Sequence, residues 1–246
     1  MDGNHGFQYK RIMPVSFSLA IFIYHVRVFN QLPLLKFLTL FSPFLPFITD
    51  AQVCWNGENK CSIAFRGSDD GTDWYSNIIG GAKTTTMKGQ SVPTGFKTEY
   101  DKIANAGSYA SWSWARGSKY CTGGRYVTGH SLGGAMAALH ALDVGTSVEL
   151  VTFAAPKAGG KNTMCSYARR YFISATWGAD PVPYLPPWGQ HSGVGKKLAG
   201  YLNWFSRYYK LDDMGCGDNS GGGTNVGQHS SSQYKWYMEQ ILGLGA

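Results

Sequence analysis

The chain has few charged residues and no concentrated basic segment. Only 15% of its 246 residues are Asp, Glu, Lys or Arg, and no run of Lys or Arg is longer than two. The net charge of +7 is therefore spread along the sequence, which is typical of a solvated surface and not of a nucleic-acid-binding segment. We expect no nucleic-acid partner, although a weak positive field would favour anionic lipid surfaces.

The usual spacings of metal ligands are absent as well. The five cysteines include no C-x-x-C pair, and the six histidines form neither H-x-x-x-H nor H-E-x-x-H. The sequence therefore predicts no metal site and no cofactor. A hydrophobic content of 43% over 246 residues is enough for a single domain with a large core.

Long hydrophobic runs are also missing. The two apolar runs near the N-terminus, 15–24 and 34–48, are both shorter than the ~18 residues of a membrane-spanning helix. The second is followed by Thr49-Asp50-Ala51, whose small residues at −3 and −1 before Gln52 are typical of a signal-peptide cleavage site. We expect residues 1–51 to be a leader for secretion, with an N-terminal membrane anchor as the alternative, and residues 52–246 to form the folded domain.

One motif carries a specific chemistry. Gly129-His130-Ser131-Leu132-Gly133 is a G-x-S-x-G sequence between a strand-like run at 125–128 and an Ala-rich helical run at 135–142. A serine on such a strand–turn–helix elbow is exposed at the top of the sheet, and a Cβ at the flanking glycines would collide with the neighbouring strand and helix. The N–H groups at the start of the helix point at any negative charge that develops there. Ser131 is therefore the predicted nucleophile.

A nucleophilic serine needs a base, and the base needs an orienting acid. Asp180 follows a strand-like run at 171–177 and precedes Pro181-Val182-Pro183, so we expect it at the same sheet edge as Ser131. Two histidines compete for the role of base. His191 lies close enough to share the loop of Asp180, whereas His229 lies in a Gly-rich loop before a helical stretch. We favour His229, because catalytic bases are commonly found on such loops.

Several segments resemble, in chain order, the motifs of the class 3 (fungal-type) lipases of the α/β-hydrolase superfamily. They are Ile63–Ser68, Asp73-Trp74 with Asn77, Thr94–Phe96, the serine elbow, Thr152–Lys157 and Asp180–Pro187. The resemblance implies an α/β-hydrolase fold, with a mostly parallel central sheet flanked by helices. It also implies that Asp180 is the acid of the triad, that His229 is the base, and that His191 is not catalytic. One spacing departs from the family, because Tyr234 lies five positions after His229 where three or four are usual.

Further roles follow from the same resemblance. Ser68 and the backbone N–H of Leu132 correspond to the oxyanion hole. Residues 69–79 occupy the position of the family's lid, in which Trp74, Ile78 and Ile79 would cover the serine in water and meet lipid at a lipid–water interface. The alternative for this segment is a surface helix that packs its tryptophan.

The cysteines favour an exported protein. Cys54 and Cys61 flank an Asn-Gly turn, which predicts a hairpin closed by a disulfide. Of the other three, Cys165 and Cys216 are the favoured pair and Cys121 stays free, with five reduced cysteines in a cytosolic enzyme as the alternative.

The pattern of apolar residues predicts strands that alternate with helices. We expect strands at 52–55, 60–66, 124–129, 148–154 and 171–177, and helices at 95–113, 131–144, 162–170 and from 230 onward. Residues 196–226 are expected to be irregular. This order favours a mostly parallel sheet.

Together these features predict a secreted serine ester hydrolase acting on a lipid or ester substrate through an acyl-enzyme. A triacylglycerol lipase is the favoured activity, and a feruloyl-type esterase or a phospholipase A1 is the alternative. The alternative outside enzymes is an inactive hydrolase fold that serves as a binding protein.

Overall fold

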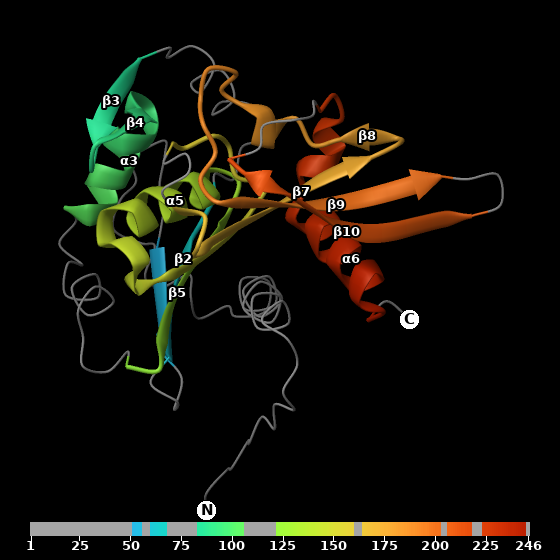
Figure 1. Cartoon of the computed structure of the whole chain (residues 1–246), viewed down its shortest axis with the longest axis horizontal. Helices are drawn as coiled ribbons and strands as arrows, with labels where there is room; N and C mark the ends of the chain where they lie inside the picture. Colours follow the sequence, from blue (N-terminus) through green and yellow to red (C-terminus); the bar gives the residue numbers. More distant parts are fainter. Residues whose placement is uncertain are drawn as a thin grey trace, which may run out of the picture. The chain divides into compact units, whose positions relative to one another are not determined.

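The fold is built on one twisted sheet whose strands lie in the order β1-β2-β5-β6-β7-β9-β10 (Figure 1). The computed structural model describes residues 51–55, 60–67, 83–105, 122–159, 164–202, 206–217 and 223–244, which all belong to one compact unit, Ser42–Ala246. The strands are β1 (Ala51–Trp55), β2 (Lys60–Phe65), β5 (Gly124–His130), β6 (Glu149–Phe153), β7 (Ala168–Ala175), β9 (Val194–Leu202) and β10 (Arg207–Cys216). Neighbours from β2 to β9 are parallel, and β1 and β10 are antiparallel edges.

Shorter elements complete the described part of the chain. The short strand β8 (Gly178–Ala179) pairs with the end of β7, and β3 (Thr84–Met87) and β4 (Gln90–Pro93) form a separate hairpin. The α-helices are α3 (Thr94–Ala104), α5 (Leu132–Val144) and α6 (Ser231–Leu242), and the 3₁₀ turns are η2 (Gly145–Ser147), η4 (Val182–Tyr184) and η5 (Val226–His229). None of the described helices is long and apolar enough to cross a membrane.

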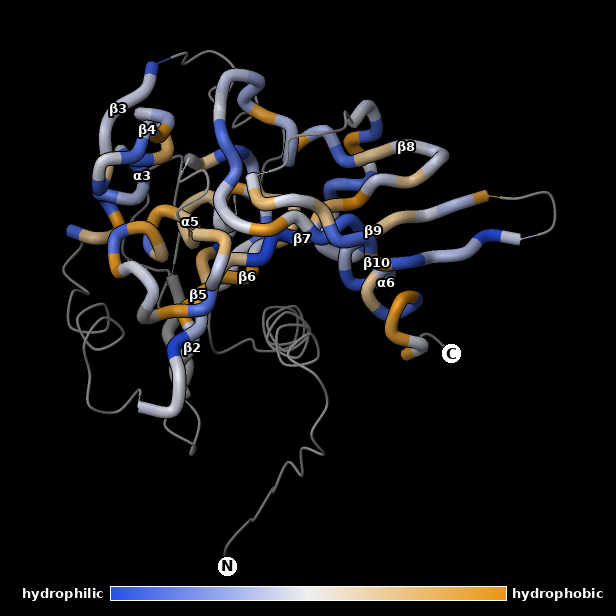
Figure 2. Tube along the Cα trace, viewed as in Figure 1, coloured by the Kyte–Doolittle hydropathy of each residue, from blue (hydrophilic) through white to orange (hydrophobic). Residues whose placement is uncertain are grey.

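Helices cover both faces of the sheet, as the sequence predicts. α5 packs against β2, β5 and β6, and α3 packs on α5, so that α5 is apolar and buried on all sides from Leu132 to Leu142. Figure 2 shows the hydrophobic colour along much of α5. α6 packs against β7 and β10, and its Tyr234 contacts Phe153 on the other face of the sheet.

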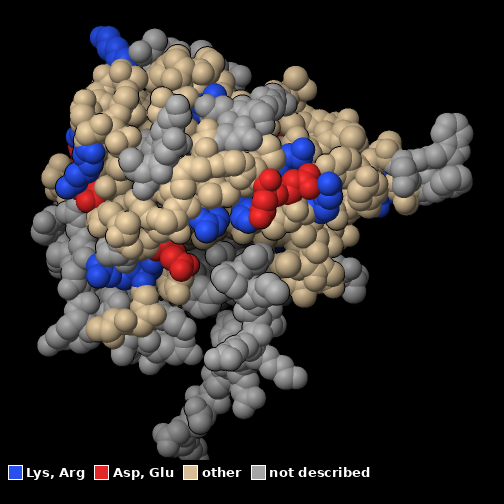
Figure 3. Space-filling model, in the orientation of Figure 1, with Lys and Arg blue, Asp and Glu red and all other residues tan. Residues whose placement is uncertain are grey.

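Two expectations for secondary structure are wrong. Residues 168–170 begin β7 and do not end a helix, and the segment expected to be irregular contains β9 and β10. Charged residues interrupt the apolar pattern of these two strands, so the sequence does not indicate them. In the folded pair, residues of opposite charge lie opposite one another. Lys196 lies opposite Asp213 and Lys197 lies opposite Asp212, and both pairs form salt bridges. Figure 3 shows this mixture of basic and acidic atoms over the middle of the strand pair.

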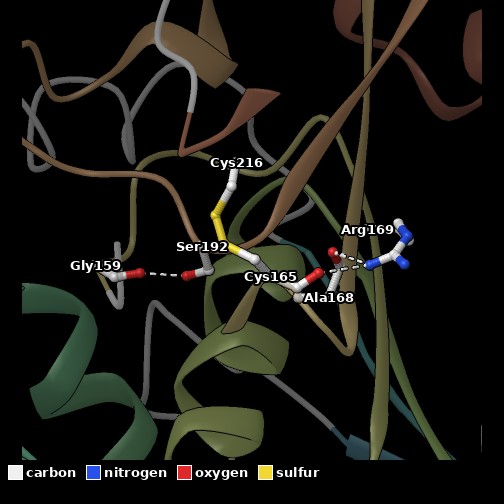
Figure 4. Close-up of a disulfide and its surroundings, with 6 residues drawn as sticks. All are labelled: Gly159, Cys165, Ala168, Arg169, Ser192 and Cys216. Atoms are coloured by element: carbon white, nitrogen blue, oxygen red, sulfur yellow. Dashed lines mark hydrogen bonds between the residues drawn. A yellow bond between two sulfur atoms is a disulfide. The ribbon is translucent and has the colours of Figure 1, made fainter. Parts of the chain in front are cut away.

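A disulfide joins Cys165 to Cys216, with Cα atoms 5.7 Å apart (Figure 4). The favoured pairing is therefore confirmed. Cys165 precedes β7, and Cys216 ends β10, which runs back to the beginning of β9. The disulfide thus fastens the edge of the sheet at which β7 and β9 begin.

Some predictions fall outside the described part of the chain. The leader, residues 1–50 of the predicted 1–51, is not described, so the boundary before residue 52 stays a prediction. The side chains of Cys54 and Cys61 are not described either, nor is the predicted helix beyond Asn105 up to 113.

Two glycines allow a matched test of the packing at the start of β9. Gly193 (φ +77°) and Gly145 (φ +75°) both have a backbone that disfavours other residues, but a Cβ at Gly193 would lie 2.4 Å from Cβ of Ala168, whereas a Cβ at Gly145 would meet nothing within 4 Å. We expect Gly145→Ala to lower the free energy of unfolding by about 1–3 kcal/mol, from backbone strain alone. Gly193→Ala should lower the free energy of unfolding by about 1–3 kcal/mol more, because the added Cβ would overlap with Ala168. Equal losses in urea unfolding would contradict this packing.

Candidate active site

Ser131 lies at the sharp turn between β5 and α5. Its backbone has φ 58° and ψ −130°, a region that is strained for any residue other than glycine. Its N–H donates to the carbonyl of Phe153 at the end of β6 (3.0 Å), and its own carbonyl accepts from the N–H of Gly134 (2.9 Å). The sheet on one side and the first turn of α5 on the other therefore hold the strained residue in place.

The glycines of the elbow are required by close backbone contacts. A Cβ at Gly129 would lie 2.3 Å from the carbonyl carbon of Gly133 on α5. A Cβ at Gly133 would lie 2.2 Å from the carbonyl oxygen of Phe65 at the end of β2. The expected collision with helix and strand is confirmed, and it shows that β5, α5 and the end of β2 meet without intervening side chains.

Three side chains from distant parts of the chain form one line of hydrogen bonds. Oγ of Ser131 lies 2.8 Å from Nε2 of His229, and Nδ1 of His229 lies 3.0 and 3.1 Å from the two carboxylate oxygens of Asp180. Because a carboxylate accepts, Nδ1 of His229 carries the proton, and its Nε2 is free to accept the proton of the serine hydroxyl. The structure thus brings together Ser131, Asp180 and His229 as the sequence predicts.

Asp180 is fully buried, and all of its described partners donate hydrogen bonds. Besides His229, the N–H of Val182 donates to Oδ1 (2.9 Å) and the hydroxyl of Tyr234 donates to Oδ2 (2.7 Å). Tyr234 in turn accepts from the N–H of Ile173 on β7 (3.1 Å). A buried carboxylate is tolerated only with such partners, so these donors hold the charge that orients His229.

The loop that carries His229 is fastened directly to the chain around Asp180. The N–H of Asn225 donates to the carbonyl of Ala179 (3.1 Å), and the side chain of Asn225 accepts from the N–H of Gly227 (3.1 Å). A Cβ at Gly223 would lie 2.3 Å from the carbonyl carbon of Asp180, so the two segments touch through their backbones. This contact explains how a histidine far along the chain reaches the acid.

His130 also holds this loop. Its Nε2 donates to the backbone carbonyl of His229 (2.8 Å), and the two imidazole rings lie 5.0 Å apart. Burial, together with the neighbouring His229, lowers the pKa of His130 to about 3, so it is neutral at physiological pH. His130 therefore links the segment of Ser131 to the segment of His229.

His191 has a different environment. It is buried, and its pKa lies well below the usual range because of that burial and of the nearby cations Arg170 and Lys157. The residue that reaches the serine is His229.

Of the two predicted oxyanion residues, Leu132 belongs to the described part of the chain. Leu132 is the first residue of α5, where N–H groups lack an acceptor within the helix. A Cβ at Gly67 would lie 3.4 Å from Cβ of Ser131, so the chain that leads to Ser68 passes next to the nucleophile. Ser68 and the lid residues Trp74, Ile78 and Ile79 fall outside the described residues and stay predictions.

Tyr234 is the residue of this hydrogen-bonded group to which the sequence assigned no role. Its spacing from His229 drew attention only as a departure from the family motif. On α6, which begins at Ser231 directly after the loop of His229, this spacing turns the tyrosine toward the sheet, where it reaches Asp180. A buried tyrosine four residues into a helix that follows the base is the signal that could have identified it.

The family Lipase (class 3) matches residues 62–190, just over half of the chain. The chain belongs to the class 3 lipase family. Ser131 and Asp180 lie within the matched segment and His229 lies beyond it.

Individual relatives of this class 3 lipase agree with the family. A secreted mono- and diacylglycerol lipase 1 from Fusarium solani is 33% identical over 144 residues, which are 54% of this chain and 41% of that protein. The chain therefore spans less than half the length of that relative. Lipase II from Rhizopus niveus has the same fold, with a TM-score of 0.55, 22% identity and 74% of each chain covered. A triacylglyceride lipase from Rhizomucor miehei is similar with a TM-score of 0.50 and 27% identity, over 61% of this chain and 62% of that one.

The role of Tyr234 can be tested by removing its hydroxyl. Tyr234→Phe leaves Asp180 and the N–H of Ile173 each with one partner fewer, so we expect a loss of about 1.5–3 kcal/mol in the free energy of unfolding. We also expect kcat on an ester substrate to fall by about tenfold with little change in KM, because His229 is oriented less well. Tyr237→Phe, the same change on the same helix, is the control and should keep kcat. A full kcat in Tyr234→Phe would argue against a positioning role.

The buried histidines predict a dependence of stability on pH. The pKa of His130 is lowered to about 3 in the folded protein and that of His191 is lowered as well, so below pH 6.5 the unfolded chain binds more protons than the folded one. Stability is therefore full above pH 6.5 and falls as the pH is lowered, by up to ~1.4 kcal/mol per pH unit for each histidine. Urea unfolding at pH 7 and pH 5 should show a smaller loss for His130→Gln than for the unmodified protein. Identical losses would mean that His130 does not contribute.

Proposed function

We propose that this class 3 lipase is a secreted serine hydrolase that cleaves acylglycerol esters through an acyl-enzyme. The observation that carries the proposal is the line of hydrogen bonds from Ser131 through His229 to Asp180, at 2.8 and 3.0 Å. This arrangement activates a serine hydroxyl for attack on a carbonyl. Because the chain spans only part of its curated relative, the activity is inferred from the site and not taken from the relative.

The proposed reaction has two halves. Oγ of Ser131 attacks the ester carbonyl while Nε2 of His229 takes its proton, and the buried charge of Asp180 stabilises the imidazolium that forms. The ester C–O bond then breaks, the leaving alcohol takes the proton from His229, and the acyl group stays on Ser131. Water repeats the same steps and releases the carboxylic acid, so the cycle needs no cofactor.

The negative charge of the tetrahedral intermediate needs donors. We assign the backbone N–H of Leu132 and the residue Ser68 to this role, each contributing about 3 kcal/mol to transition-state stabilisation. The close approach of Gly67 to Ser131 supports the assignment. The segment 69–79, with Trp74, Ile78 and Ile79, is the proposed cover of the site in water.

Glycerol esters are the proposed substrate class for two reasons. The relative from Fusarium solani is named as a mono- and diacylglycerol lipase, and the structural relative from Rhizomucor miehei as a triacylglyceride lipase. The word "secreted" in the name of the first, together with the disulfide between Cys165 and Cys216, supports export.

A fluorophosphonate probe and three variants test the proposal. The unmodified enzyme should be labelled and should hydrolyse p-nitrophenyl esters, whereas Ser131→Ala should not be labelled. Ser131→Ala and His229→Ala should each lower kcat by on the order of 10⁴ or more, because nucleophile and base act as one unit. His191→Ala is the control and should keep most of the activity.

Two results would refute this mechanism. Hydrolysis that persists in a folded Ser131→Ala variant would show that Ser131 is not the nucleophile. A dead His191→Ala variant beside an active His229→Ala variant would reverse the assignment of the base.

A further inference from the structure

The pair β9–β10 extends beyond the rest of the sheet. The last rung that β7 shares with β9 joins Ala175 to Gly200, whereas β9 and β10 continue to pair to Leu202 and Arg207. Figure 1 shows this end of the pair projecting past its neighbours. No strand of the described part of the chain pairs with this extension, and Leu202, Arg207 and Tyr208 on it are exposed.

The side chains on this extension are apolar and aromatic. Leu202 is 59% exposed and Tyr208 is 47% exposed, which are high values for large hydrophobic residues. Tyr208 stacks on Tyr201 of the facing strand, with ring centroids 5.0 Å apart and an angle of 15° between the rings. We call the described residues Leu202, Arg207 and Tyr208 the hairpin end.

The charge of the hairpin end is positive. Arg207 lies over the ring of Trp177, at 5.1 Å from its centroid, and Lys210 follows on the same strand. Lys210 forms a salt bridge with Asp212 (2.9 Å), and Lys196 and Lys197 form salt bridges with Asp213 and Asp212, so Arg207 carries the positive charge of the hairpin end. Apolar and aromatic side chains beside an arginine match the boundary of an anionic lipid layer, where tyrosine rings and basic groups both bind favourably.

The hairpin end also lies at the edge of the sheet that carries the site. Parallel strands place their carboxyl ends together, and β5 is followed at this edge by Ser131, as β7 and β8 are by Asp180. β9 is parallel to β7 and ends at Leu202. Val226, which begins the turn of His229, is 66% exposed near the same site. The hairpin end and Ser131 therefore belong to the same side of the sheet, where the parallel strands end.

We propose that the hairpin end docks the protein on anionic lipid surfaces and so turns the edge of Ser131 toward its substrate. The inferred role of this surface rests on the proposed function, but the binding of the surface to lipid is measured independently of catalysis. Leu202 and Tyr208 supply apolar contact, and Arg207 supplies attraction to lipid phosphates.

Vesicle binding tests the proposal on the full chain. Sedimentation with phosphatidylcholine vesicles, with and without phosphatidylglycerol, is compared for the unmodified protein, Leu202→Ser/Tyr208→Ser, and Arg207→Gln. Leu244→Ser is the matched control, since Leu244 is 62% exposed after the end of α6. All variants should melt like the unmodified protein and should hydrolyse a dissolved short-chain ester equally.

We expect the double variant to bind anionic vesicles about tenfold or more weakly, and Arg207→Gln about fivefold more weakly. Leu244→Ser should bind normally. Unchanged binding in the double variant, equal weakening by Leu244→Ser, or binding that does not depend on phosphatidylglycerol would overturn the proposal. A change of oligomeric state in the hairpin variants would overturn it too, because the occupant would then be a second copy of the chain.

Ser131→Ala separates the two proposals. If Ser131→Ala binds vesicles but the unmodified protein has no esterase activity, the proposed function fails and the docking surface stands. If esters are hydrolysed but the hairpin variants bind vesicles normally, the docking surface fails alone.

Discussion

The buried carboxylate of Asp180 is the constraint on which the rest of the site depends. A charge without contact to water must be surrounded by donors, and here they come from η4, from the loop of His229 and from α6. The same requirement therefore fastens the C-terminal helix to β7, since Tyr234 accepts from Ile173 while it donates to Asp180. The hydrogen bonds of Tyr234 therefore support Asp180 and also hold α6 against β7.

The nucleophile depends on a second constraint, which is the close contact of backbones at the elbow. Gly129, Gly133 and Gly67 bring β5, α5 and the end of β2 together at distances that no Cβ would allow. Ser131 keeps a strained backbone because these contacts, and the bond from its N–H to Phe153, leave it no alternative. His130 then joins this elbow to the loop of His229, so that Ser131, His229 and Asp180 are all fixed to the sheet.

The two ends of the parallel strands carry different features. At the edge where β7 and β9 begin, the disulfide between Cys165 and Cys216 ties the antiparallel strand β10 to the parallel part of the sheet. At the opposite edge lie Ser131, Asp180 and the exposed end of β9–β10. The strand pair thus runs from the disulfide to the exposed side chains of Leu202 and Tyr208.

The sequence by itself determined the elements whose signal is local. The elbow of Ser131, the buried helix α5, the strand before Asp180 and the helix after His229 all follow from short patterns of apolar residues, glycines and prolines, and they are present. Tertiary structure alone decided what depends on pairing between distant segments. β9 and β10 became visible only through the match of Lys196 and Lys197 with Asp213 and Asp212, and Tyr234 acquired its role only when α6 packed against β7. The physical reason is that periodicity records which face of an element is buried, whereas a hydrogen bond or a disulfide needs a partner whose position depends on how the whole chain folds.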